Sequence, residues 1–163
     1  MSIYSIPPLI CSLLALFLGL IVYEKINKSS INTAFFFLCL TVFWWQFDWF
    51  ILFNIKNESL ASFIIKVGYS GIIFIPPTCY LFVIKFLKLK ERLVIRLVYT
   101  VGLVFMLFLW FSNYFIDGFY KYSWGFYPKA NFLHLVYLCL ISFLIIRGLI
   151  LLKVSLKEQK KQF

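Results

Sequence analysis

The stretch GIIFIPPTCYLF, residues 71–82, places two adjacent prolines inside a run that is otherwise almost wholly apolar. Within a helix, a proline removes one backbone hydrogen bond, and its ring crowds the carbonyl four residues earlier. For Pro76 and Pro77 these carbonyls belong to Ile72 and Ile73. We therefore expect a helix that is kinked at Pro76-Pro77, and two explanations stay open: simple packing, or a ligand pocket or moving hinge.

The composition of the whole chain indicates that its solvent is lipid. Of 163 residues, 63% are hydrophobic and 13% are charged, whereas soluble domains have about 45–50% apolar and about 25% charged residues. The mean hydropathy is +0.94. Sixteen basic and six acidic residues cannot cover the surface of such a chain, so the apolar excess must face hydrocarbon.

Five apolar stretches approach the ~20 residues that a helix needs to cross a bilayer. They are residues 8–23, 33–53, 67–87, 93–111 and 132–152. Their length and lack of alternation argue against a membrane β-barrel, and lipid offers no partner for an open backbone. The predicted fold is an all-α integral membrane protein, a single membrane domain over residues 1–163 with five transmembrane helices.

The basic residues predict the orientation of these helices. Most of them follow the first, third and fifth spans. By the positive-inside rule, the amino terminus is then outside and the carboxyl terminus cytoplasmic. Arg147 lies close enough to the cytoplasmic face for its guanidinium group to snorkel toward it.

An acidic residue in the second span, within FWWQFDWF at residues 43–50, is the most costly group in the predicted membrane region. An ionised Asp48 is unfavourable there unless it is paired or faces water. Lys66 and His134 lie at a similar level and are candidate companions. The alternative is that Asp48 reaches the outer headgroup layer, where tryptophans gather. Three tryptophans lie beside it: Trp44, Trp45 and Trp49.

The connector before the last span, YFIDGFYKYSWGFYPKAN at residues 114–131, is the most distinctive loop. It combines aromatic residues that favour strands with turn signals at Asp117-Gly118 and Ser123-Trp124-Gly125, so we predict a small β-hairpin. Its rings either line the mouth of a site or lie on the membrane surface.

No pattern in the chain predicts an enzyme. The four cysteines lie within spans at spacings unlike a metal motif, and one histidine and six acids form no catalytic set. We expect no catalytic residue, metal or cofactor. The net charge of +10 is spread over the connectors, which indicates anionic lipid headgroups and not nucleic acid as the partner.

One long segment resembles a known family. YFIDGFYKYSWGFYPKANFLHLVYL, residues 114–138, is similar to a connector and helix of the seven-helix N-terminal membrane region of bacterial histidine kinases and related signalling proteins, including some diguanylate cyclases. GYSGIIFIPPTCYLFVIKF resembles its third helix, LGLIVY and NTAFFFLCLTVFWW its first two, and LLKVSLKEQKKQF its cytoplasmic link. The resemblance implies a multi-pass protein of the bacterial cytoplasmic (inner) membrane. The chain holds five of the seven helices and no output domain, as a truncated relative or a fragment of a larger sensor.

We therefore predict a membrane sensory or signal-input module with a pocket between the second, third and fifth spans, roofed by the hairpin. The candidate ligand-binding residues are Trp44, Trp45, Asp48, Pro76, Pro77, Trp124, Tyr127 and His134. Candidate partners, besides the bilayer, are a membrane or cytoplasmic signalling protein and a second copy of the chain. The alternative is a structural or interaction subunit without a small-molecule ligand, suggested by the small residues Gly68 and Gly71. A transporter or channel component is less well supported, because the chain shows no pair of matching broken helices.

Overall fold

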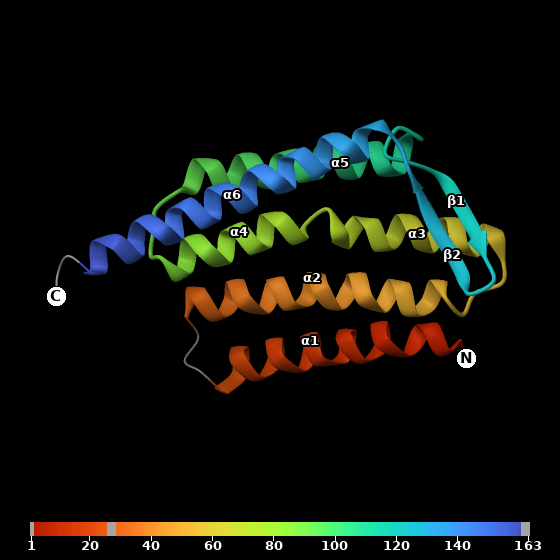
Figure 1. The fold of residues 1–163 in the computed structure, drawn as a ribbon, viewed down its shortest axis with the longest axis horizontal. Coiled ribbons are helices and arrows are strands. Elements are labelled where there is room, and N and C mark those ends of the chain that lie inside the picture. The colour runs from red at the N-terminus through yellow and green to blue at the C-terminus, as the bar shows by residue number, and fades with distance from the viewer. Residues whose placement is uncertain (1, 26–28, 161–163) are drawn as a thin grey trace.

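A computed structural model describes residues 2–25 and 29–160, which form one helical bundle with a small hairpin at one end (Figure 1). In chain order the elements are η1 (Ile3–Ser5), α1 (Ile6–Lys25), α2 (Ser30–Leu52), α3 (Glu58–Ile72), α4 (Ile75–Phe86), α5 (Arg92–Phe111), β1 (Ile116–Tyr122), β2 (Gly125–Ala130) and α6 (Phe132–Lys160).

Five candidate spans in the described residues are long and apolar enough to cross a membrane: Ile3–Glu24, Ser30–Leu52, Glu58–Phe86, Arg92–Phe111 and Phe132–Lys157. The third combines α3 and α4 and begins well before residue 67, where the sequence placed it. Lys66 interrupts the apolar run, but its ammonium group donates to the Trp110 carbonyl at 3.4 Å and leaves the helix intact. The protein is therefore an integral membrane protein built from five apolar helical spans.

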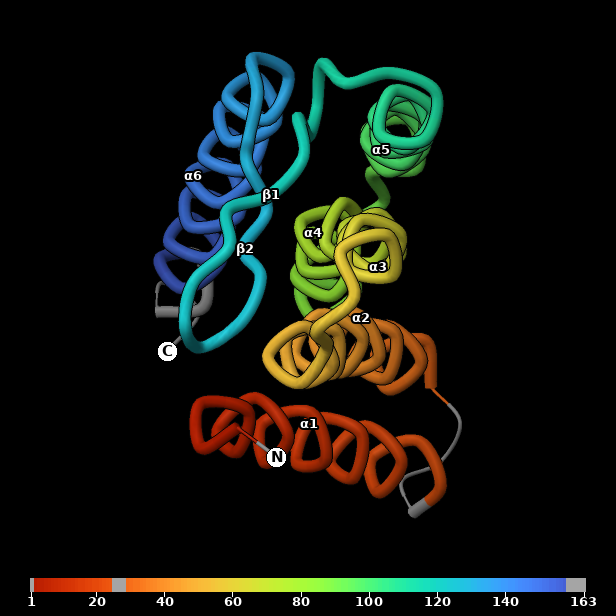
Figure 2. Tube along the Cα trace, turned by 90° about the vertical axis from the view of Figure 1, so that its right-hand side faces the viewer, coloured from red at the N-terminus to blue at the C-terminus, as the bar shows by residue number. Residues whose placement is uncertain are grey.

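The helices lie in a simple order across the bundle. In Figures 1 and 2, α1 lies beside α2, α2 lies beside α3 and α4, and α5 and α6 lie on the opposite side of α3 and α4. The larger buried cluster lies at the hairpin end, where α2, α3, α5 and α6 meet under the strands, and includes Leu52, Ile65, Leu109, Phe115 and Tyr137. The smaller cluster lies at the opposite end of the bundle and consists of Tyr80, Ile84, Val98 and Leu144.

Two glycines let α2 and α3 approach closely. A Cβ added to Gly68 would lie 2.0 Å from Cγ of Asp48, and one added to Gly71 would lie 2.4 Å from Cδ1 of Trp44. The Trp44 indole also donates to the Val67 carbonyl at 2.9 Å. The small-residue face of α3 is thus occupied by side chains of α2, within the same chain.

The third span is broken just before its prolines. α3 ends at Ile72 and α4 begins at Ile75, so Pro76 and Pro77 lie in the first turn of α4. A helix tolerates proline in its first turn, because the N–H groups there have no intrahelical partner. The discontinuity falls at the carbonyls that the prolines leave without donors, and not at Pro76-Pro77 itself, where the sequence placed it. α4 is consequently a separate segment that is joined to α3 through residues 73 and 74.

We expect Gly68→Ala to lower the free energy of unfolding by about 1–3 kcal/mol, the usual cost of overpacking, because the new methyl group overlaps the Asp48 carboxyl group. Gly148→Ala is the matched control, since a Cβ there meets no atom within 4 Å and alanine favours a helix over glycine. SDS-induced unfolding in mixed micelles, followed by circular dichroism, measures both. Equal stability of the two variants would contradict the close approach of α2 and α3.

Candidate functional site

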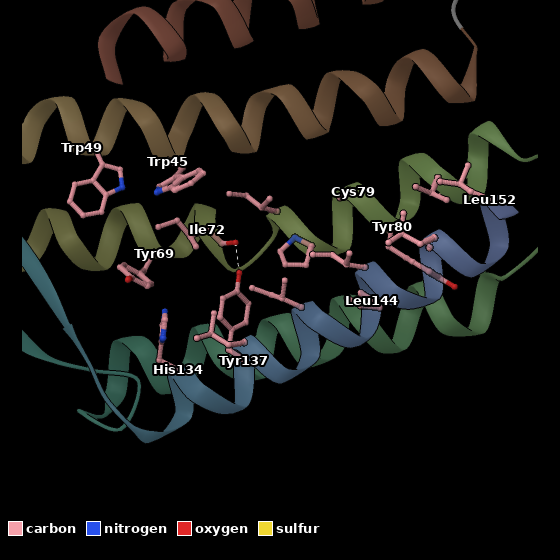
Figure 3. Close-up of a pocket in the computed structure, with 18 of the residues that line it drawn as sticks. Trp45, Trp49, Tyr69, Ile72, Cys79, Tyr80, His134, Tyr137, Leu144 and Leu152 are labelled. Carbon is pink, nitrogen blue, oxygen red and sulfur yellow. Dashed lines mark hydrogen bonds between the residues drawn. The ribbon is translucent and has the colours of Figure 1, made fainter. Parts of the chain in front are cut away.

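An apolar cavity of about 600 Å³ lies between α2, the broken span and α6. Its two ends differ in chemistry (Figure 3). Trp45, Trp49, Tyr69 and His134 surround the end near the hairpin, whereas Tyr80 and Leu152 lie at the other end. Aliphatic side chains of α4 and α6 line the length between them. The volume and lining are typical of a small-molecule site.

The hairpin closes one end of this cavity. β1 and β2 pair antiparallel, with Tyr122 opposite Gly125, as the turn signals in the sequence predicted. Gly125 has φ of +144°, and a Cβ there would lie 2.9 Å from the backbone of Phe53 at the end of α2. The Tyr127 ring, from β2, packs on Trp49 with centroids 5.2 Å apart. The hairpin therefore spans from α6 to α2 as a roof.

The predicted site residues divide into two groups. Trp45, Pro76, Tyr127 and His134 line the cavity. Trp124 does not, because its ring stacks on Tyr122 with centroids 4.7 Å apart and packs edge-on against Phe53. It holds the hairpin tip on α2.

The other three predicted residues also lie outside the lining. Trp44 is turned toward Gly71 and Val67, and Pro77 is buried beside the break. Asp48 is 6% exposed and packs against Gly68. Within the described residues, no hydrogen bond or ion pair reaches its carboxyl group. It lies on α2 between the two cavity-lining tryptophans, Trp45 and Trp49.

Neither expected companion of Asp48 pairs with it. Lys66 donates to the Trp110 carbonyl. The His134 ring instead packs among aromatic rings, 5.8 Å from Tyr69, 5.6 Å from Phe115 and 5.9 Å from Tyr137, measured between centroids. The Asp48 carboxyl group instead packs against Gly68 of α3, a contact that depth along the sequence does not reveal.

Tyr137 is the most consequential residue that the sequence reasoning missed. Its hydroxyl donates to the Ile72 carbonyl at 2.7 Å (Figure 3). This carbonyl is one of the two that lose their helical donor because of the prolines. The side chain is only 2% exposed. Its position three residues after His134, on the same face of a helix, was the available signal. α6 thus supplies the donor that the broken span lacks.

A polar cluster at the opposite end of the cavity was also missed. Arg147 of α6 donates from Nε to the Tyr80 hydroxyl at 2.7 Å and from Nη2 to both Glu91 oxygens, at 2.8 and 2.9 Å. Tyr80 of α4 in turn donates to Glu91 in the connector before α5. Arg147 therefore pairs within the protein, where the sequence had suggested snorkelling. We call these three residues the Arg147 cluster.

The Arg147 cluster makes Glu91 a stronger acid than usual. Burial alone would raise the pKa of Glu91, but the hydrogen bonds from Tyr80 and Arg147, with the Arg147 charge, outweigh it and lower that pKa. The ionised form of Glu91 is therefore the form that stabilises the fold. Among the described residues, no group of three His, Cys, Asp or Glu side chains could hold a metal ion.

We expect Glu91→Gln to destabilise the protein by about 1 kcal/mol, because the pair is partly exposed and solvent screens it. Glu58→Gln, which breaks the exposed Glu58–Lys121 pair, should change little. The folded-state pKa of Glu91 lies below its unfolded value of about 4.3. The difference in unfolding free energy between the parent protein and Glu91→Gln should therefore be fully present above about pH 4.3. It should vanish as the pH falls through the folded-state pKa of Glu91. Unfolding curves measured at several pH values test this, and a difference that grew on acidification would contradict it.

The comparison with known protein families agrees with this architecture. Residues 7–162 match the model of the N-terminal 7TM region of histidine kinase. No curated protein and no solved structure gives a significant match to the chain. The match covers nearly the whole chain, with four of the five candidate spans complete and the first from residue 7 onward. The chain belongs to the family of N-terminal seven-transmembrane regions of histidine kinases.

Proposed function

We propose that this chain is the sensory input region of a bacterial signalling protein, and that occupancy of the cavity sets the position of α4. The observation that carries the proposal is the placement of the cavity. One wall is α4, directly beyond the helix break, and the facing wall is α6, the last described element of the chain. Family membership supports a role in signal input.

The break allows α4 to move as a unit. Residues 73 and 74 join α3 to α4 outside either helix, so α4 can tilt without carrying α3 with it. Hinges of this kind absorb a conformational change in a few residues at the ends of elements. A ligand shifts such an equilibrium only if it binds one arrangement more tightly than the other.

The Arg147 cluster provides the path from α4 to α6. Tyr80 faces the cavity and also bonds Arg147 and Glu91. A displacement of α4 therefore changes the hydrogen bonds that hold α6. In this proposal α6 carries the change toward the output region.

The proposed orientation places the hairpin outside the cell and the Arg147 cluster near the cytoplasmic face. Supporting it are the basic residues, which concentrate in the connectors at the Arg147 end of the bundle and in the last turns of α6, as the positive-inside rule requires. The membrane would be the bacterial inner membrane.

The alternative role as an interaction subunit loses one of its supports. It was suggested by the small residues on the third span, but Gly68 and Gly71 receive Asp48 and Trp44 of the same chain. These glycines therefore do not offer a free face to a partner helix.

A chimera tests the proposed function. The chain is joined to the remaining helices and kinase region of a family member, and phosphotransfer is measured in cells. Pro76→Ala with Pro77→Ala should shift the resting output by about tenfold, the effect of about 1.4 kcal/mol on a two-state equilibrium, because α3 and α4 can then join. Pro7→Ala with Pro8→Ala, in the first turn of α1, is the matched control and should leave the output unchanged.

The same experiment reports orientation, because a kinase region joined to the carboxyl end needs cytoplasmic ATP. Equal output from the parent and both double variants would reject the hinge. A well-expressed parent chimera without any kinase activity would reject the cytoplasmic carboxyl end.

A further inference from the structure

The dimensions of the cavity suggest an elongated ligand. Its lining extends along α6 from His134 to Leu152, which is about 27 Å at 1.5 Å per residue. The volume of about 600 Å³ is distributed along this length. An apolar space of this length fits an alkyl chain that lies along α6.

The hairpin end of the cavity offers hydrogen-bond donors without partners. Trp45, Trp49, Tyr69, Tyr127 and His134 all line it, and within the described residues none of their side chains makes a hydrogen bond. Indole N–H groups donate only, and hydroxyl and imidazole groups can also donate. These side chains would therefore hold a group that accepts hydrogen bonds.

Two tryptophans outside the cavity show the contrast. The Trp44 indole donates to the Val67 carbonyl at 2.9 Å, and the Trp110 indole donates to the Ser70 hydroxyl at 2.9 Å. The indoles of Trp45 and Trp49, at the hairpin end of the cavity, have no such acceptor among the described residues.

The charges around the cavity indicate an uncharged ligand. No lysine or arginine is among the lining residues. Asp48, between Trp45 and Trp49 on α2, is buried and has no ion pair among the described residues, which favours the uncharged form of its carboxyl group, so it gives a carboxylate or phosphate no charged partner at that end. The polar group at the far end, the Tyr80 hydroxyl, is already engaged by Arg147 and Glu91. The acceptor of the ligand should therefore lie at the hairpin end.

We propose that the cavity binds an uncharged amphiphile, with a carbonyl or ester oxygen among the hairpin-end donors and an alkyl chain between α4 and α6. This inference rests on the proposed function, because it names the ligand class of the same site. Two sources share this chemistry: a free carbonyl compound that partitions into the membrane, and the acyl ester of a bilayer lipid.

Binding of three matched probes to the full chain in phospholipid nanodiscs tests the proposal. The probes are decyl methyl ketone, dodecane and dodecanoate, measured by native mass spectrometry and thermal stabilisation. The ketone should bind saturably. Dodecane, which has no acceptor, should bind about tenfold more weakly, the effect of one hydrogen bond, and dodecanoate should also bind more weakly. Equal binding of all three would overturn the assignment.

Variants locate the two halves of the ligand. Tyr69→Phe should weaken ketone binding several-fold and leave dodecane binding unchanged, because it removes one donor. Gly148→Leu should weaken both, since the glycine lines the cavity and has open space beside it. Tyr114→Phe, an exposed tyrosine outside the lining, is the matched control. Ketone binding unaffected by Tyr69→Phe and Gly148→Leu, in protein that remains folded, would overturn the assignment.

The number of phospholipids that stay bound to the protein when the ketone binds distinguishes the two sources of the ligand. Loss of one retained phospholipid for each ketone bound would identify bilayer lipid as the resident ligand, and binding without such loss would identify a free compound. Both results support the ligand class. The kinase chimera separates this inference from the proposed function: ketone binding without a change in output leaves the ligand class standing and contradicts the sensor. An output that depends on Pro76 and Pro77, without any ketone binding, would support the sensor and contradict the ligand class.

Discussion

The hydrogen bond from Tyr137 to the Ile72 carbonyl is the interaction on which the rest of this structure depends. Two adjacent prolines in a membrane span release backbone carbonyls, and in hydrocarbon each unsatisfied group costs several kcal/mol. The Tyr137 hydroxyl satisfies one of them at 2.7 Å. The break between α3 and α4 thus has a protein donor for one of its carbonyls, which lipid could not supply. The same bond holds α6 against the end of α3.

A second polar contact holds α6 further along its length. Arg147 lies ten residues after Tyr137, which is about 15 Å along the helix, and it bonds Tyr80 and Glu91. Between and around these two contacts the facing side chains are aliphatic, and they leave the cavity open. Both contacts join α6 to the broken span, and in the proposed mechanism they link movement of α4 to occupancy of the cavity. This proposed linkage agrees with the sensory role that membership of the histidine kinase family suggests.

The sequence predicted the spans well because hydropathy is read along one dimension. Prediction from the sequence failed for side chains whose surroundings depend on how two helices pack against each other. Trp44 and Asp48 share the tryptophan-rich turn of α2 with Trp45, yet they face the glycines of α3 while Trp45 faces the cavity. The Arg147 cluster joins residues 56 positions apart, which no local pattern reveals. The break lies before the prolines because the lost hydrogen bonds involve carbonyls four residues earlier.

The most direct test is the unfolding free energy of Tyr137→Phe, which keeps the ring and removes only the hydroxyl. SDS unfolding in mixed micelles should show a loss of about 1–3 kcal/mol, the cost of one buried unsatisfied carbonyl, with faster amide exchange around residues 72–78. Tyr4→Phe, an exposed tyrosine near the start of α1, should show no loss. A Tyr137→Phe protein as stable as Tyr4→Phe, with unchanged exchange, would contradict the account.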